Sequence, residues 1–218
     1  NIGGDEPWEL GQGWSADAVE TKGKHRVYLD HLLAIHRLVT ARGKTMQFWG
    51  DIIMESPELA SELPDNSIGI IWGYEADHPF EQQCTAFRES GIPYYVSPGT
   101  SAWNTIGGRY ANAITTIKEA TRQAIQNGAK GMLLTDWGDF GHHHFPPISY
   151  PAIVWGSTLS WNRDSENEFD DIQAINTTFF EGKSKPLAQA IISLSESINA
   201  FSDSPANRTL LNDLLFSN

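Results

Sequence analysis

Cysteine is nearly absent from this sequence, which contains only Cys84. A disulfide within the chain and a zinc site built from several thiolates are therefore excluded. Basic residues are also scarce, because 15 Lys and Arg stand against 27 Asp and Glu and give a formal net charge of -12. This balance argues against the phosphate backbone of a nucleic acid and against an anionic membrane surface as partners.

Long apolar runs are missing as well. No stretch approaches the roughly 20 apolar residues of a transmembrane helix, so we predict no membrane span. The N-terminus lacks the layout of a signal peptide. This assigns no compartment, because we expect the chain to begin inside a longer protein. With 40% hydrophobic residues among 218, the chain can bury a core, and its length suits one domain with a small appendage.

Helical and strand-like patterns alternate along the chain. Apolar residues recur at helical spacing in four long segments, which predict helices at residues 24–42, 80–90, 109–126 and 149–159. Short apolar runs predict strands at residues 46–51, 68–74, 93–98 and 132–139. Residues 11–21 are polar and aperiodic, and we expect a loop there. The repeated succession of helix, glycine and strand predicts an α/β fold with parallel strands.

Tryptophan is abundant, with eight residues. A buried indole N–H needs a hydrogen-bond partner, which makes tryptophan a costly filler, and sugar-binding sites use its ring as an apolar platform. We expect Trp155 and Trp161 to pack in the core. Trp49, Trp72 and Trp137 instead come at the ends of predicted strands, where barrels and open α/β sheets place their active sites. Core packing is the alternative for these three rings.

The first eight residues, NIGGDEPW, combine a glycine pair, the adjacent carboxylates Asp5 and Glu6, and a proline. The glycines permit a sharp turn, and the proline ends regular structure. Adjacent acids at the end of a strand point in different directions, so one can face a substrate while the other supports it. A solvated turn collects the same residue types. The aromatic and acidic residues downstream favour the functional interpretation.

Residues 1–6 resemble the His-x-Gly-Gly-Asp-Glu motif of glycoside hydrolase family 20, the β-N-acetylhexosaminidases, although Asn1 replaces the usual His. In that family the motif ends the fourth strand of a (β/α)8 TIM barrel. The resemblance implies that residues 1–162 form the C-terminal half of such a barrel, from the end of strand 4 through helix 8. Residues 163–218 would begin an α-helical extension. The chain alone would then be inactive, and it would self-associate or pair with the missing N-terminal half.

The resemblance also implies catalytic roles. Glu6 would be the general acid/base, and Asp5 would orient the substrate's 2-acetamido N–H and stabilise an oxazolinium intermediate. Such enzymes retain configuration by substrate assistance and are exceptions to the usual pair of catalytic carboxylates. They need no metal or cofactor. The expected substrate is a glycan or glycoconjugate that ends in β-linked N-acetylhexosamine, either GlcNAc or GalNAc.

The predicted contacts with the sugar come from later strands. In the family, tryptophans surround the acetamido methyl group, and the corresponding residues are Trp49, Trp72 and Trp137. Asp139 resembles the acid that binds the outer hydroxyls of the terminal sugar, with a solvated loop acid or a helix cap as the alternative. The family's Tyr-Leu-Asp string on the seventh strand is absent here. Tyr95 or Trp103 is expected to take its place.

Two alternative functions stay open. An ordinary retaining barrel glycosidase would use Asp136 or Asp139 as the nucleophile opposite Glu6. A half-barrel without catalysis would bind sugar or serve as a scaffold. Residues 142–144 are three consecutive histidines, which cannot all face one ion from regular structure, because zinc sites use spaced ligands. We expect these histidines to form a loop over the site.

Overall fold

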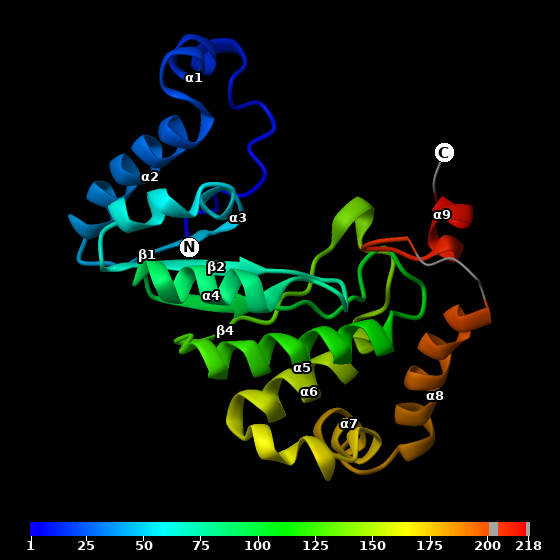
Figure 1. Ribbon diagram of the computed structural model, residues 1–218. Coiled ribbons are helices and arrows are strands. Elements are labelled where there is room, and N and C mark those ends of the chain that lie inside the picture. Colours follow the sequence, from blue (N-terminus) through cyan, green and yellow to red (C-terminus); the bar gives the residue numbers. More distant parts are fainter. Residues whose placement is uncertain (201–204, 217–218) are drawn as a thin grey trace. The chain divides into compact units, whose positions relative to one another are not determined.

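The computed structural model describes residues 1–200 and 205–216 and shows an α/β fold (Figure 1). A parallel sheet has the strand order β1-β2-β3-β4. Its strands are β1 (Met46–Trp49), β2 (Ser67–Trp72), β3 (Tyr94–Ser97) and β4 (Gly131–Met132). The register of β1 on β2 runs from Met46 opposite Ser67 to Trp49 opposite Ile70. The predicted parallel α/β fold is therefore confirmed.

The long predicted helices are also present. They are α2 (Lys24–Thr40), α4 (Phe80–Ser90), α5 (Tyr110–Asn127) and α6 (Tyr150–Trp161). Between β1 and β2 the chain forms the short helix α3 (Asp51–Met54) and the 3-10 helix η2 (Pro57–Glu62). A glycine with positive φ follows α4, since Gly91 has a φ of 76°. This left-handed conformation ends the helix at little cost only because glycine has no Cβ.

Two predictions of local structure are wrong. Residues 11–21 are not a loop, because they contain η1 (Gly13–Ser15) and most of α1 (Ala16–Lys22). Helix α1 is too short to show a clear apolar period, and it is stabilised by packing against α2. The strand predicted at residues 132–139 is also much shorter than expected. Beyond β4 the ladder continues only as an isolated bridge between Gly99 and Thr135.

The chain divides into two compact units. The first comprises Asn1–Trp72, Pro79–Val96 and Gln123–Gly131. In this unit α2 packs on β1, and α4 packs on β2 (Figure 1). The contact of α4 depends on glycine, because an added Cβ on Gly69 would lie 2.3 Å from the ring of Phe87. Phe87 and Cys84 of α4 are buried in this core.

The second unit comprises residues 73–78, Ser97–Arg122 and the described residues from Met132 onward. After α6 the described chain holds helices and 3-10 turns, namely η5 (Arg163–Asn167), α7 (Asp171–Phe180), α8 (Lys185–Glu196), η6 (Ser197–Ala200) and α9 (Leu210–Phe216). Helix α7 packs on both α6 and α8 (Figure 1). Trp155 is buried between helices as predicted, but Trp161 is 93% exposed, so its predicted core position is wrong. Trp161 is the last residue of α6, where the helix leaves the core.

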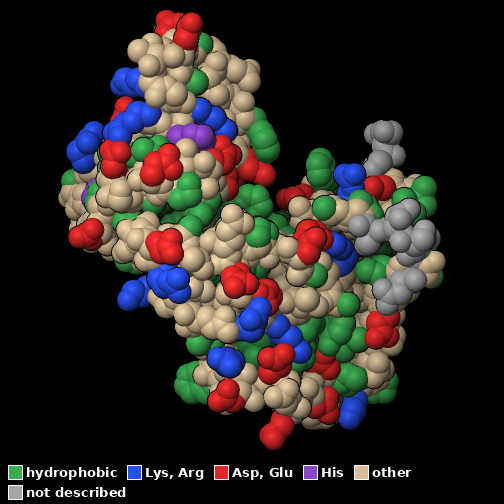
Figure 2. Space-filling view, viewed as in Figure 1, with side chains coloured by type: hydrophobic (Ala, Val, Ile, Leu, Met, Phe, Trp, Pro, Cys, Tyr) green, Lys and Arg blue, Asp and Glu red, His purple; other side chains and the backbone are tan. Residues whose placement is uncertain are grey.

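The surface carries charges of both signs. On the face that Figure 2 shows, acidic side chains are interspersed with basic ones. Among the described residues, no helix is long and apolar enough to cross a bilayer.

Candidate functional site

The N-terminal residues run beside β1. The N–H of Ile2 donates to the carbonyl of Gln47 at 2.9 Å, and the N–H of Trp49 donates to the carbonyl of Gly3 at 3.1 Å. Residue numbers increase together along both segments, so residues 1–4 follow β1 in the same direction. This arrangement brings Asp5 and Glu6 to the edge of the sheet where β1 and β2 end.

The turn that carries the two acids is tightly built. Gly3 and Gly4 have φ values of 74° and 98°, and Glu6 has a φ of 45°. The hydroxyl of Tyr28, a buried residue of α2, donates to the carbonyl of Gly4 at 2.7 Å. An added Cβ on Gly4 would lie 2.9 Å from this hydroxyl oxygen. A non-glycine residue such as Glu6 in the left-handed region is strained by roughly 1 kcal/mol or more, and such strain is concentrated at functional sites.

Asp51 holds this turn from the neighbouring strand end. Its Oδ2 accepts a hydrogen bond from the backbone N–H of Glu6 at 3.1 Å. Its Oδ1 accepts from the indole N–H of Trp72 at 3.4 Å. Partial burial raises the pKa of the Asp51 carboxyl, the two hydrogen bonds oppose this rise, and the charge of Asp5 adds to it. One carboxylate therefore links the acidic turn to the end of β2.

Asp51 is not among the site residues that the sequence predicts. A signal was present, because Trp49-Gly50-Asp51 has the same residues as Trp137-Gly138-Asp139, whose aspartate was assigned. Tyr28 was also missed, since a tyrosine within an amphipathic helix has the pattern of a core residue. Burial raises the pKa of Tyr28, and the nearby Asp51 and Asp5 raise it further. Its hydroxyl therefore stays protonated and can serve as a donor.

The first unit contains five of the predicted residues, and four of them lie near the ends of β1 and β2. Asp5 and Glu6 are exposed, while Trp49 at the end of β1 is buried and Trp72 at the end of β2 is half-buried. Tyr95 lies within β3, next to β2 in the sheet, and is half-buried.

The second unit contains an aromatic cluster of Tyr74, Trp103 and Trp137. The indole N–H of Trp137 donates to the hydroxyl of Tyr74 at 3.0 Å. The rings of Tyr74 and Trp103 meet edge to face, with centroids 5.0 Å apart and planes at 84°. An added Cβ on Gly99 would lie 2.4 Å from Trp103, so glycine allows this close packing. Trp103 is only 2% exposed and thus supports Tyr74 rather than presenting a free face.

Asp136 and Asp139 have different surroundings. The carboxylate of Asp136 accepts hydrogen bonds from the hydroxyls of Thr100 at 2.5 Å and Ser149 at 2.8 Å. Both of its oxygens are engaged in these hydrogen bonds, which makes Asp136 a poor match for a nucleophile. Asp139 is exposed at the start of η3 (Asp139–Gly141).

The three histidines lie in the segment that follows η3. The rings of His142 and His144 have centroids 4.2 Å apart, and His143 stacks on Phe216 at 4.0 Å. Burial lowers the pKa of His144, Asp136 opposes this shift, and His142 lowers the pKa further. Across the described residues, no group of three or more His, Cys, Asp or Glu side chains is placed to hold a metal ion.

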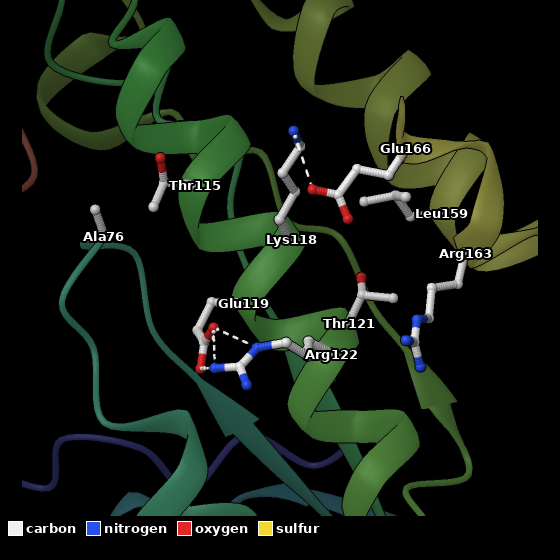
Figure 3. Close-up of a pocket in the computed structure, with 9 residues that line it drawn as sticks. All are labelled: Ala76, Thr115, Lys118, Glu119, Thr121, Arg122, Leu159, Arg163 and Glu166. Carbon is white, nitrogen blue, oxygen red and sulfur yellow. Dashed lines mark hydrogen bonds and ion pairs between the residues drawn. The ribbon is translucent and has the colours of Figure 1, made fainter. Parts of the chain in front are cut away.

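A groove of about 370 Å³ on the second unit is lined largely by charged side chains (Figure 3). Its charged side chains are mostly paired, with Lys118 against Glu166 at 3.2 Å and Arg122 against Glu119 at 2.7 Å. The Lys118 ammonium also lies over the ring of Trp155, 4.3 Å from its centroid. None of the predicted site residues lines this groove.

Neither models of known protein families nor curated proteins match this chain. The assignment of a function therefore rests on the residues and their geometry.

Proposed function

We propose that this chain belongs to a retaining, substrate-assisted β-N-acetylhexosaminidase similar to glycoside hydrolase family 20. The observation that best supports this proposal is the pair of hydrogen bonds that the Asp51 carboxylate accepts. One comes from the backbone N–H of Glu6 and the other from the indole N–H of Trp72. This carboxylate joins an exposed pair of acids to an aromatic residue at adjacent strand ends, as a glycosidase needs. In this proposal the four parallel strands are those of the C-terminal half of a (β/α)8 barrel.

The first step would break the glycosidic bond. Glu6 gives its proton to the leaving oxygen as the bond from that oxygen to C1 breaks. The carbonyl oxygen of the substrate's acetamido group attacks C1 and forms an oxazolinium ring. Asp5 accepts a hydrogen bond from the acetamido N–H, which holds the group in place and stabilises the positive charge.

The second step would return the enzyme to its starting state. Glu6, now a carboxylate, takes a proton from water as the water oxygen attacks C1. The bond from the acetamido oxygen to C1 breaks, and the sugar leaves with its original configuration. Trp72, which is half-buried, offers apolar surface for the acetamido methyl group, and the role of the buried Trp49 stays a prediction. The binding roles of Tyr95, Trp103, Trp137 and Asp139 stay predictions.

The leaving-group dependence of Glu6→Gln tests the proposal in the intact protein. Turnover of an N-acetylglucosaminide with a poor leaving group should fall roughly 10²–10⁴-fold, because general-acid help is lost. Turnover of an activated nitrophenyl substrate should be spared. Glu20→Gln is the matched control, since Glu20 is exposed on α1. Equal losses on both substrates would contradict the role of Glu6.

Inhibition by a thiazoline that mimics the oxazoline tests the substrate-assisted route. We expect strong competitive inhibition that weakens markedly in Asp5→Asn, because the amide cannot supply the same negative charge. A covalent glycosyl ester trapped on an aspartate or glutamate would exclude this route and favour the two-carboxylate mechanism.

A further inference from the structure

A cavity of about 630 Å³ lies beside the acidic turn in the first unit. Its floor is the face of α2 that presents Val27, Tyr28 and His31, and its wall includes Leu10 and, from η1, Trp14. The lining is mainly apolar, and its size is within the range of small-molecule sites. The proposed chemistry does not use Leu10, Trp14 or Val27.

The wall of this cavity is a hydrogen-bonded segment that carries the exposed ring of Trp14. The Gln12 side chain donates to the carbonyl of Trp8 at 3.1 Å, and the Ser15 hydroxyl donates to the carbonyl of Gln12 at 3.0 Å. The N–H of Gly11 donates to the same hydroxyl at 2.9 Å. Trp8 is nevertheless 77% exposed, and Trp14 is fully exposed. These hydrogen bonds hold the backbone that carries Trp14, and its exposed ring offers a face on which a ligand can stack.

The cavity borders the acidic turn. Gly4 and Pro7 both line it, and these two residues flank Asp5 and Glu6 in the chain. Tyr28 lines it too, and its hydroxyl binds the carbonyl of Gly4. Asp5 and Glu6 do not themselves line the cavity, but a substrate whose reacting oxygen lies at Glu6 has the cavity beside it.

We propose that this cavity binds the leaving group of the substrate, through a ring with a flat apolar face that stacks on Trp14. The inference rests on the proposed function, in which Glu6 protonates the leaving oxygen. The terminal sugar would contact Trp72 instead, which does not line the cavity. An aryl group and a second pyranose both have such a flat apolar face.

Substrates that differ only in the leaving group test this site in the intact protein. The probes are the methyl, 4-methylumbelliferyl and N-acetylglucosaminyl β-glycosides of N-acetylglucosamine. In Trp14→Ala, the preference in kcat/KM for a ring-bearing substrate over the methyl glycoside should fall roughly 2- to 10-fold, the value of one aromatic stack. Loss of preference for the aryl substrate alone, or for the disaccharide alone, identifies which ring the cavity accepts.

Two controls separate this effect from misfolding. Trp161→Ala removes an equally exposed tryptophan that lies outside the cavity, and it should leave every preference unchanged. The thiazoline inhibitor has no leaving group, so its affinity should be the same in wild type and in Trp14→Ala. Unchanged preferences in both Trp14→Ala and Leu10→Ala would overturn the inference, as would an equal loss on all three substrates.

Direct binding distinguishes this inference from the proposed function. If the protein cleaves no glycoside and binds no thiazoline, the proposed function fails. Binding of 4-methylumbelliferone, followed by its fluorescence, still reports on the cavity. Binding that is lost in Trp14→Ala supports a site for flat apolar rings, and absence of binding to the wild type overturns it.

Discussion

At the scale of single residues, the acidic turn depends on positions where no other residue fits. Gly4 combines a φ of 98° with the close approach of the Tyr28 hydroxyl. The same hydroxyl anchors the carbonyl of Gly4, so the glycine and the tyrosine together set the path into Asp5 and Glu6. The strain at Glu6 persists because the turn is held on both sides, by Tyr28 and by Asp51.

Gly4→Ala should lower the free energy of unfolding by about 1–3 kcal/mol, because it adds steric overlap to left-handed strain. Gly43→Ala is the matched control. Gly43 has a φ of 65°, but an added Cβ there meets nothing within 4 Å. Gly43→Ala should therefore show only the cost of placing alanine in a left-handed backbone conformation. Urea denaturation measures both variants, and equal losses would show that the Tyr28 contact contributes nothing.

Asp51→Asn should reduce turnover roughly 10- to 100-fold, because an amide offers one acceptor where the carboxylate uses two. The expected cause is a misplaced Glu6, so the affinity for the terminal sugar should change less than kcat. Turnover close to wild type would show that Asp51 does not position the acid.

Asp51 also predicts a pH effect on stability. Burial raises its pKa in the folded state above the ordinary 3.8, so the folded protein binds this proton more tightly than the unfolded chain does. Its contribution to stability therefore increases as the pH falls through the folded pKa. The stability of wild type relative to Asp51→Asn should rise between neutral and mildly acidic pH. Denaturation of both proteins at several pH values checks this. A difference in stability that stays constant with pH would contradict the raised pKa of Asp51.

At the scale of elements, α4 packs closely on the sheet because two glycines leave space for one of its side chains. Phe87 packs where Gly69 in β2 and Gly50 after β1 leave room. Helix α4 can therefore lie close to the strands whose ends carry Trp49 and Trp72. A larger residue in β2 would push the helix away and shift those ends.

Gly69→Ala should destabilise the protein by about 1–3 kcal/mol, because its Cβ would lie 2.3 Å from the Phe87 ring. The double variant Gly69→Ala with Phe87→Leu should recover part of this loss, since the smaller side chain makes space. Thermal unfolding of the wild type, the two single variants and the double variant measures the coupling. Strictly additive effects would show that the two residues do not compete for space.

At the scale of the whole molecule, a buried ion pair connects distant parts of the second unit. Arg109 donates two hydrogen bonds to the carboxylate of Glu75, one of them at 2.9 Å, and the N–H of Asn207 donates to the same carboxylate at 2.7 Å. Arg109 is almost fully buried. Burial alone would raise the pKa of Glu75, but the hydrogen bonds from Arg109 and Asn207 outweigh it and lower the pKa below 4.5.

This pair should make the protein sensitive to acid. A lowered pKa means that Glu75 stabilises the folded state above pH 4.5, its ordinary pKa, and that this contribution disappears as the pH falls through the folded pKa. Glu75→Gln should cost about 3–5 kcal/mol at neutral pH, because Arg109 is left buried without its counter-charge. The variant should also lose less stability than wild type on acidification. If the stabilities of wild type and Glu75→Gln fell in parallel as the pH is lowered, this prediction would be contradicted.

The sequence by itself determined the order and type of the main elements. Apolar residues at helical spacing and short apolar runs are local patterns, and so are the glycines that end the helices. The same patterns placed Trp49 and Trp72 at strand ends, because parallel strands joined by helices all finish on one edge. The position of the Asp5 and Glu6 turn at that edge was implied instead by the resemblance of residues 1–6 to the motif of glycoside hydrolase family 20.

Only the tertiary structure decided what these local patterns could not contain. The carboxylate of Asp51 meets a backbone 45 residues away and an indole 21 residues away. Helix α1 forms because it packs on α2, and Trp161 is exposed because α6 ends outside the core. These outcomes depend on contacts between segments far apart in sequence, and neither residue type nor local spacing records which segments will meet.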